Sequence, residues 1–402
     1  MKNLTVEEAR ARMLAGAGRL EAETVALEAA AVGRVVAADL RSLRDQPPFR
    51  ASAMDGYAVR FADADGRAAT LTVAGESAAG RGYGTVLQPG QAVRIFTGAA
   101  LPEGADTVVI QEEAVREGEA VTVGPLSEAS GNVRPRGGDF REGETLLAAG
   151  LALDPWRLSL AASAGAASLT LARSPRVAIF GGGDELVAPG ETPGPWQIFE
   201  STTLTLAHLV RGWGGTPLPQ PRLADRLEAI VEAIRNIDCD LILTVGGASV
   251  GDHDLVRPAQ AQLGLELTVA SIAMRPGKPT FFGTLADGRR VLGLAGNPAS
   301  AMVGAELFLR SILLQMQGAD PSPRLERARL TAPMKPNTPR EHWVRAGLSS
   351  GDDGALLVRP FPEEDSSLVS VFARADALLR RPPSAPAAAA GEVVEVLRLP
   401  RL

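Results

Sequence analysis

Three glycine-bearing turns, each placed directly after an apolar strand-like run, constrain the fold of this chain most strongly. They read TVGGASVGDHD from Thr244 to Asp254, MRPGKPTFFG from Met274 to Gly283, and GLAGNPASA from Gly293 to Ala301. Glycine lets backbone N–H groups approach an anion where a Cβ atom would block it. Together the turns predict one anion-binding rim at the ends of buried strands.

The region that holds these turns alternates apolar runs with helical patterns. Strands are expected at Val177 to Phe180, Leu241 to Val245 and Val291 to Leu294, and helices at 204–210 and 225–234. This alternation is typical of a parallel sheet in an α/β layer, where ligands bind at the carboxyl ends of the strands. We expect all three turns to lie at such ends.

The third turn also begins a helix. Asn297 and Pro298 suit the N-cap and the first helical position of an apolar pattern that runs towards Gly318. The unpaired N–H groups of the first helical turn, with the hydroxyl of Ser300, predict a site for phosphate or another tetrahedral oxyanion. Ordinary helix capping explains Asn297 equally well.

The second turn carries two cations, Arg275 and Lys278, on a loop stiffened by prolines. The chain has 41 Lys plus Arg residues, yet lysine occurs only at Lys2, Lys278 and Lys335. An ammonium and a guanidinium are not interchangeable at a compact anion site. Lys278 is therefore predicted to bind an anion, the alternative being a solvated surface lysine.

Further motifs extend the pattern along nearly the whole chain. They are SAMDGYAVR at 52–60, RIFTG at 94–98 with PEGAD at 102–106, NVRPRGGD at 132–139, and GGDELV at 182–187. With PGKP and GNPxS, in this order, they make the chain resemble the molybdopterin molybdenumtransferases, known as MoeA in bacteria and as the E domain of gephyrin in animals.

The resemblance implies an enzyme of molybdenum cofactor biosynthesis. Molybdate would replace adenylate on adenylylated molybdopterin, with release of AMP and with Mg²⁺ bridging phosphate oxygens. It also implies a homodimer whose cleft lies between subunits, with a molybdopterin adenylyltransferase and apo-molybdoenzymes as further partners.

Helix-capping and turn residues along the chain, taken with the resemblance, predict a multidomain α/β plus β fold. Thr5 and Glu8 form a capping box that opens an N-terminal helix. Short strands split by Gly and Pro are expected at 70–73, 92–96 and 107–110.

A helix from Pro155 to near Gly165 flanks this β unit on its other side, which agrees with the inserted domain that the resemblance implies. After the ADPSP boundary at 319–323, a loose Pro/Ala-rich loop at 381–391 is expected before a last strand at 393–397.

Four domains are therefore expected. An N-terminal helical and mixed domain takes residues 1–46 and 140–174, and an inserted mostly-β domain takes 47–139. A MogA-like three-layer α/β domain with a parallel-rich sheet takes 175–318, and a small C-terminal β-barrel takes 319–402.

Site residues are carried over from the family pattern to matching positions. The catalytic carboxylates are Asp55, Glu185, Asp225 and Asp254, of which Asp254 and Glu185 are also the expected Mg²⁺ ligands. The substrate or molybdate contacts are Thr97, Asp139, Gly246, Gly247, Ser249, Arg275, Lys278, Pro279, Asn297, Pro298, Ser300, Arg345 and Ser370.

Simpler roles stay open for several of these carboxylates. Asp254 and Asp55 suit turns, and Asp225 with Glu228 suits a helix cap. Asp139 follows Arg134 and Arg136, so a solvated salt-bridge cluster explains it as well.

The chain departs from the family pattern at four places. Arg275 replaces the first lysine of KPGKP, Ala295 replaces the proline before Gly296, and EST at 200–202 lacks an asparagine. Where the last domain should carry a glycine-rich turn, the chain reads EDSS at 364–367, which adds two acids near a presumed anion site. Either the substrate binds a shifted loop or the chain is a divergent paralogue.

The cations nearest to these acids in sequence are Arg359 and Arg374. Each could neutralise an acid of the loop.

Composition excludes several further classes of site and partner. At 402 residues, with 45% hydrophobic residues, the chain can bury several hydrophobic cores. Its net charge of -6 gives no reason to expect that it binds nucleic acid. A single Cys239 excludes an internal disulfide framework, and three scattered histidines lack zinc-ligand spacing. Without an apolar targeting core or a run of roughly 20 apolar residues, we expect a cytoplasmic protein with no membrane contact.

One alternative function is a molybdopterin adenylyltransferase, which leaves residues 5–139 and the last β domain unexplained. Another is a non-catalytic molybdopterin carrier or gephyrin-like scaffold. A phosphate-handling hydrolase is disfavoured because no nucleophile and base constellation is present.

Overall fold

The computed structural model of the protein describes residues 3–28, 31–221, 226–247 and 255–400. The chain divides into two compact units. Unit 1 comprises Met1–Ala38, Ala149–Asp154 and Ser168–Leu402, and unit 2 comprises Asp39–Ala148 and Pro155–Ala167.

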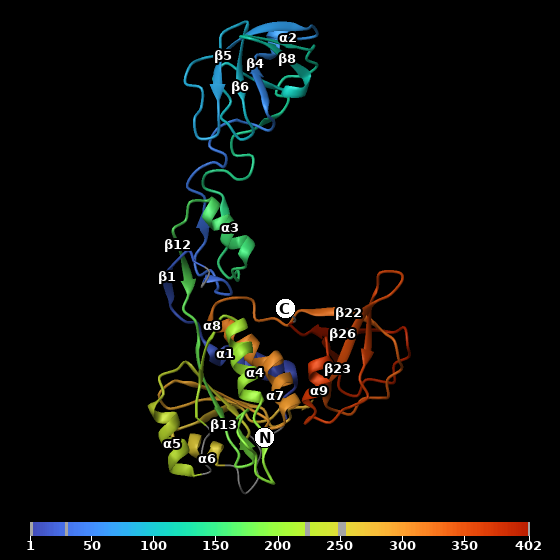
Figure 1. Ribbon diagram of the computed structural model, residues 1–402. Helices are drawn as coiled ribbons and strands as arrows, with labels where there is room; N and C mark the ends of the chain where they lie inside the picture. The colour runs from blue at the N-terminus through green and yellow to red at the C-terminus, as the bar shows by residue number, and fades with distance from the viewer. Residues whose placement is uncertain (1–2, 29–30, 222–225, 248–254, 401–402) are drawn as a thin grey trace. The chain divides into compact units, whose positions relative to one another are not determined.

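A six-stranded sheet forms the centre of unit 1 (Figure 1). The strand order is β16 (Thr216–Pro219), β13 (Arg176–Gly181), β17 (Leu241–Val245), β21 (Arg290–Leu294), β20 (Phe281–Thr284) and β18 (Glu266–Val269). The first four strands are parallel, whereas β20 and β18 run antiparallel to their neighbours. The predicted parallel-rich sheet is therefore confirmed.

Helices cover both faces of this sheet. One face carries α1 (Val6–Ala17), α4 (Thr202–Gly212), α7 (Pro298–Gly304) and α8 (Arg310–Met316), and the other carries α5 (Leu227–Asn236) and α6 (Val256–Gln262). Because side chains alternate along β13, Ile179 packs into the first layer and Phe180 into the second. The result is the expected three-layer domain.

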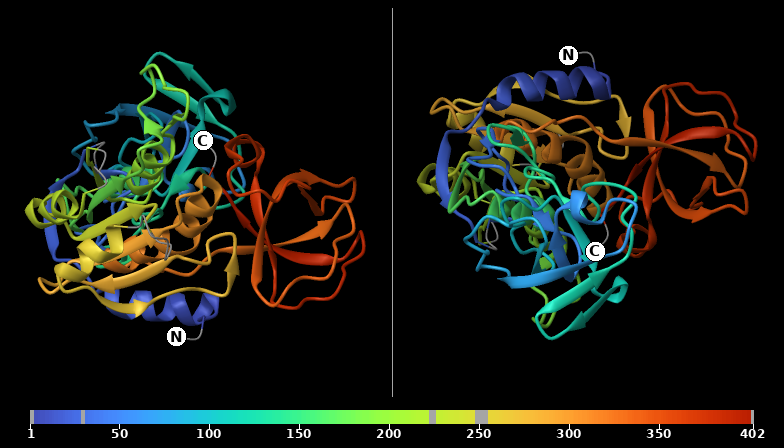
Figure 2. Two further views of the ribbon diagram at one scale, coloured as in Figure 1. Left: turned by 90° about the horizontal axis from the view of Figure 1, so that it is seen from below. Right: turned by 90° about the horizontal axis from the view of Figure 1, so that it is seen from above.

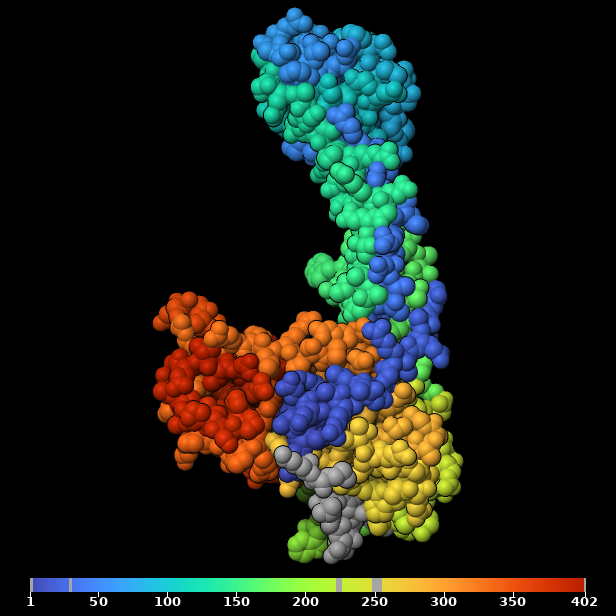
Figure 3. Space-filling model, turned by 180° about the vertical axis from the view of Figure 1, so that it is seen from behind, coloured from blue at the N-terminus to red at the C-terminus, as the bar shows by residue number. Residues whose placement is uncertain are grey.

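The N-terminal helix begins as predicted. The Thr5 hydroxyl accepts a hydrogen bond from the Glu8 amide, and the Glu8 carboxylate accepts one from the Thr5 amide. Figure 3 shows α1 in dark blue beside yellow residues, and α1 contacts β18 and β20.

The long helix predicted after Asn297 is interrupted by a π-helical turn, η3 (Ala305–Leu309), between α7 and α8. Over the described residues, the stretch Pro298–Met316 is the one helix long and apolar enough to cross a membrane, with a mean hydropathy of 1.2. Since 83% of that stretch is buried inside the structure, it is a core helix of the α/β layer.

The C-terminal part of unit 1 is a small closed barrel, whose red strands form a ring in Figure 2. Its strands are β22 (Leu325–Leu330), β23 (Glu341–Ser350), β24 (Leu356–Pro360), β25 (Ala377–Arg381) and β26 (Val393–Arg398), with α9 (Val369–Arg374) between β24 and β25. Pairing of β23 with β25 closes the ring. The predicted last strand is confirmed, and the expected loop before it contains an isolated bridge at Ala388.

Short pairs of strands complete unit 1. They are β1 (Ala22–Ala26) with β12 (Ser168–Ala172), and β14 (Leu186–Val187) with β15 (Ile198–Phe199). A further short strand, β19 (Met274–Arg275), pairs with β23 of the barrel.

Unit 2 is built mostly of strands, as predicted. Its main sheet has the order β7 (Thr107–Ile110), β4 (Gly56–Val59), β6 (Gln91–Ile95), β5 (Ala69–Ser77), β9 (Ala120–Val123) and β8 (Ala114–Glu117). Two small sheets pair β2 (Leu40–Arg41) with β11 (Thr145–Leu147), and β3 (Ala51–Ser52) with β10 (Val133–Arg134). The helical segments are α2 (Phe61–Ala64), η2 (Gln111–Glu113) and α3 (Pro155–Ser163).

Candidate functional site

Glycine turns meet at the carboxyl ends of the parallel strands in unit 1. Gly246 and Gly247 follow β17 with φ angles of 82° and 66°, a left-handed conformation that favours glycine. A Cβ atom on Gly296, after β21, would lie 3.4 Å from the Gly246 Cα atom, and one on Gly246 would lie 3.6 Å from the Gly182 carbonyl oxygen. The turns after β13, β17 and β21 thus form one backbone-lined rim.

The second predicted turn, which carries Arg275 and Lys278, is placed differently. Residues 276–280 follow β19, which pairs with the barrel strand β23 rather than with the parallel sheet. The expectation that all three turns lie at the carboxyl ends of strands of the α/β sheet is therefore wrong for this loop. The loop still reaches the rim, because a Cβ atom on Gly277 would lie 3.6 Å from the Ser300 carbonyl oxygen in α7.

Lys278 is exposed on this loop, and over the described residues its ammonium has no hydrogen bond or ion pair. Pro279 beside it is half-buried. This exposed ammonium is therefore available to contact a ligand.

The start of α7 agrees with the prediction in position but not in bonding. Pro298 occupies the first helical turn after Asn297, yet the Asn297 side chain caps no helix N–H group. Its amide instead donates a hydrogen bond of 2.9 Å to the Ser366 hydroxyl. The Ala299 amide donates to the Ser366 carbonyl oxygen at 2.9 Å, so part of the predicted oxyanion site is filled by the protein, while Ser300 is buried.

Arg275 does not face solvent alone. Its guanidinium lies 3.3 Å from the Glu364 carboxylate and 2.9 Å from Nδ1 of His342. Burial, with the nearby charges of Arg275 and Arg345, lowers the pKa of His342 to about 3. His342 is therefore neutral at physiological pH and accepts the Arg275 hydrogen bond.

The Arg345 side chain holds the acidic loop, residues 363–365, by hydrogen bonds to the backbone of that loop. The buried guanidinium donates to the carbonyl oxygens of Asp365 and Glu363, at 2.9 and 2.6 Å. The Asp365 carboxylate accepts hydrogen bonds from the amide and hydroxyl of Ser367. Arg345 is thus a brace for this loop rather than an open anion contact.

The two arginines nearest in sequence to Glu364 and Asp365 form different ion pairs from those expected. Arg374 lies 3.6 Å from the Glu363 carboxylate, and Glu364 pairs with Arg275. Over the described residues, Arg359 pairs with neither acid of the loop. Ser370 is exposed on α9.

One predicted metal ligand lies at the rim. Glu185, in the turn after β13, is exposed, and its carboxylate lies against Gly183. Mg²⁺ is often held by one or two carboxylates together with substrate phosphates, so Glu185 fits such a role. No group of three or more potential metal ligands occurs among the described residues, and Asp225, Ser249 and Asp254 lie outside them.

In unit 2 the structure brings Asp55 and Thr97 together. The Asp55 Oδ1 atom accepts hydrogen bonds of 2.7 Å from the Thr97 amide and 2.8 Å from its hydroxyl. The two bonds from Thr97 hold the pKa of the Asp55 carboxyl below its ordinary value. A Cβ atom on Gly56 would lie 1.9 Å from the Val109 carbonyl oxygen, so only glycine fits after Asp55.

Asp139 lines an open cavity of about 780 Å³ in unit 2, together with Arg134 and Gly98. The alternative salt-bridge cluster around Asp139 is not seen among the described residues, where Arg136 pairs instead with Asp45 at 2.5 Å. Asp139 is exposed.

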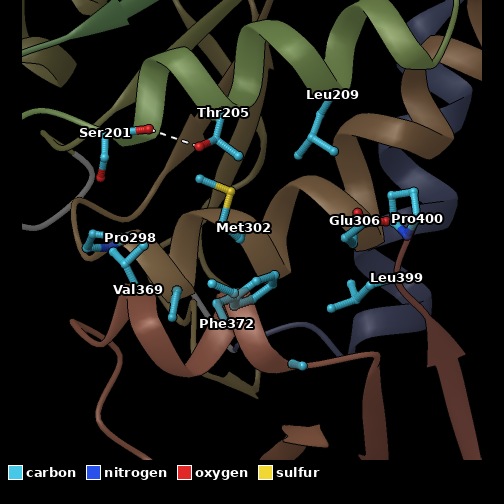
Figure 4. Close-up of a pocket in the computed structure, with 13 residues that line it drawn as sticks. Ser201, Thr205, Leu209, Pro298, Met302, Glu306, Val369, Phe372, Leu399 and Pro400 are labelled. Carbon is cyan, nitrogen blue, oxygen red and sulfur yellow. Dashed lines mark hydrogen bonds between the residues drawn. The ribbon is translucent and has the colours of Figure 1, made fainter. Parts of the chain in front are cut away.

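A second cavity, of about 260 Å³, lies in unit 1 between α4, α7 and α9 (Figure 4). Thr205, Met302 and Phe372 line it, together with Glu306. Burial raises the pKa of Glu306 to about 7, and over the described residues its carboxyl has no hydrogen bond.

Two further groups at the site, His342 and the Ser366 hydroxyl, were not among the predicted contacts, because their bonds to Arg275 and Asn297 join residues far apart in the chain. Glu306, which lines the separate cavity, is buried without any local motif that signals it. Glu200 is one of the departures from the family pattern, and it lies directly before α4. Its carboxylate accepts hydrogen bonds from the amides of Thr202 and Thr203, so it caps the start of this helix.

Comparisons with known proteins agree with this architecture. Residues 4–165 match the family model "MoeA N-terminal region (domain I and II)", residues 178–315 match "Probable molybdopterin binding domain", and residues 327–399 match "MoeA C-terminal region (domain IV)". A solved MoeA protein from Pyrococcus horikoshii has a TM-score of 0.83 at 26% identity, covering 99% of this chain and 100% of that chain.

Curated relatives match over nearly the full length. The molybdopterin molybdenumtransferase of Haemophilus influenzae is 32% identical and covers 98% of both chains. That of Bacillus subtilis is 33% identical, covering 98% of this chain and 94% of the relative. The chain therefore belongs to the molybdopterin molybdenumtransferase family, whose members are enzymes of molybdenum cofactor biosynthesis.

Proposed function

We propose that the protein inserts molybdate into adenylylated molybdopterin, with release of AMP and in a Mg²⁺-dependent reaction. The observation that carries this proposal is the contact between the Gly246 and Gly296 turns at the carboxyl ends of parallel strands. That place in an α/β sheet is where ligands bind. The family membership supplies the chemistry.

The rim residues have distinct roles in this proposal. The Gly247 backbone N–H group is the proposed donor to the substrate phosphate, because the Gly246 amide donates to the Leu294 carbonyl oxygen at 3.2 Å. Lys278 neutralises an incoming oxyanion. Pro279 stiffens the loop that carries Lys278. Asp55, Thr97 and Asp139 of unit 2 bind substrate in the assembled enzyme.

Glu185 and Asp254 are the proposed Mg²⁺ ligands. When bound, the ion neutralises phosphate charge and orients the leaving adenylate. Asp254→Asn should raise the Mg²⁺ concentration needed for half-maximal turnover without lowering the melting temperature. Unchanged Mg²⁺ dependence with a large loss of stability would make Asp254 a turn residue only.

The remaining catalytic proposal concerns Asp225, which is assigned by position in the family pattern. We further propose a cytoplasmic homodimer, with the four domain boundaries given above. It receives substrate from a molybdopterin adenylyltransferase and delivers product to apo-molybdoenzymes.

One observation favours a second candidate, a non-catalytic molybdopterin carrier or scaffold. Arg275 and Arg345, two proposed substrate contacts, are engaged by the acidic loop at 363–365. The deciding experiment incubates the protein with adenylylated molybdopterin, Mg²⁺ and molybdate. AMP release with activation of an apo-molybdoenzyme supports the enzyme, and binding without AMP release supports the carrier.

A further inference from the structure

Arg275 has one negative partner over the described residues, the Glu364 carboxylate at 3.3 Å. Its other partner, His342, is buried and neutral, so it accepts a hydrogen bond without supplying charge. The Arg275 Nε atom is buried and unbonded. The charge of Arg275 is therefore balanced by Glu364, in the position where an external oxyanion would provide the balance.

The backbone of the acidic loop does not depend on the Glu364 side chain. Arg345 holds the carbonyl oxygens of Glu363 and Asp365, and Ser366 is bonded to Asn297. The Glu364 side chain is 55% exposed. It can therefore rotate into solvent while the loop stays anchored.

We propose that the Glu364 carboxylate is an internal competitor for oxyanions at Arg275, and that it sets the affinity of this site for molybdate. The inference rests on the proposed function, because it concerns the same anion site. The carboxylate oxygens stand in for those of the oxyanion, and binding at Arg275 requires that they leave.

Competition differs measurably from simple repulsion. If the Glu364 carboxylate must leave before any anion binds, removing its charge increases the affinity for a monoanion and for a dianion by the same factor. If it stays in place and only repels, the dianion gains more than the monoanion. Molybdate and perrhenate are tetrahedral oxyanions that differ in charge, so the pair separates these cases.

The test is calorimetric titration of the full-length protein with molybdate and with perrhenate, at fixed pH and ionic strength. Glu364→Gln should tighten both anions by about two- to fivefold, the range expected for release of a partly exposed ion pair. The matched control is Glu363→Gln, which removes the same charge one residue away from a pair with Arg374. It should leave both affinities unchanged.

A double-mutant cycle completes the test. In the Arg275→Ala background, Glu364→Gln should have no effect on either anion. Equal effects of the two Gln variants, a larger gain for molybdate than for perrhenate, or no gain in either anion would overturn the competitor role. Lack of AMP release by a wild type that binds molybdate would contradict the proposed function alone.

Discussion

The Asn297 side chain donates a hydrogen bond of 2.9 Å to the Ser366 hydroxyl, which joins the start of α7 to the acidic loop of the barrel. The residues are 69 positions apart in sequence. This bond places the barrel loop directly on the glycine-rich rim.

The first prediction concerns this bond. Asn297→Ala and Ser366→Ala should each lower the free energy of unfolding by about 1 kcal/mol, the usual size of one hydrogen bond. The double variant should cost less than the sum of the two, because both changes remove the same bond. Additive losses in urea denaturation would show that the pair contributes no coupling.

The second prediction concerns Arg345. Arg345→Met removes two charge-assisted hydrogen bonds to carbonyl oxygens of the acidic loop, so the free energy of unfolding should fall by about 3 kcal/mol. Arg359→Met, at an exposed position of the same barrel, is the control and should change it by less than about 0.5 kcal/mol. Equal melting temperatures for the two variants would remove the bracing role of Arg345.

The third prediction concerns Glu306. Its pKa rises from an ordinary 4.5 to about 7 in the folded protein, so the folded state keeps a proton that the unfolded chain has lost. Stability should therefore fall as the pH rises from 4.5 to 7 and then level off, by about 3 kcal/mol in total.

Glu306→Gln should remove this fall, raising the melting temperature at pH 8 but changing it little at pH 4.5. The exposed Glu232→Gln is the matched control and should leave the pH profile as it is. A Glu306→Gln protein that keeps the wild-type pH profile would show that Glu306 titrates normally.

The fourth prediction concerns Asp55. Asp55→Asn keeps an oxygen that can accept the Thr97 hydrogen bonds but removes the negative charge. If the charge acts on substrate, molybdate-dependent AMP release should fall at least about tenfold, or about 1.4 kcal/mol in activation free energy, with an unchanged melting temperature. Full activity would leave Asp55 as the turn residue of the alternative interpretation.

Local patterns predicted much of the fold. Leu241–Val245 is mostly apolar and buried throughout because both faces of its sheet are covered, and the Thr5–Glu8 capping box acts within one helical turn. The sequence could not show that β19 leaves the α/β sheet to pair with β23, because strand pairing depends on residues far apart in the chain.

The same limit applies to the candidate site. Arg275 and Glu364 were each recognised as departures from the family pattern, but their contact at 3.3 Å joins β19 to the loop between β24 and α9. Likewise, Arg345 was expected to bind substrate, and only the structure reveals that its guanidinium is engaged by Glu363 and Asp365.

The most direct test of the account is molybdate-dependent AMP release by Lys278→Ala, compared with Lys335→Ala. Lys278 and Lys335 are both exposed, so the two variants remove the same charge from the surface. We predict that Lys278→Ala abolishes AMP release and that Lys335→Ala retains it. Activity of the Lys278 variant within about threefold of wild type, less than about 1 kcal/mol, would contradict the assignment of the glycine-rich rim as the molybdate insertion site.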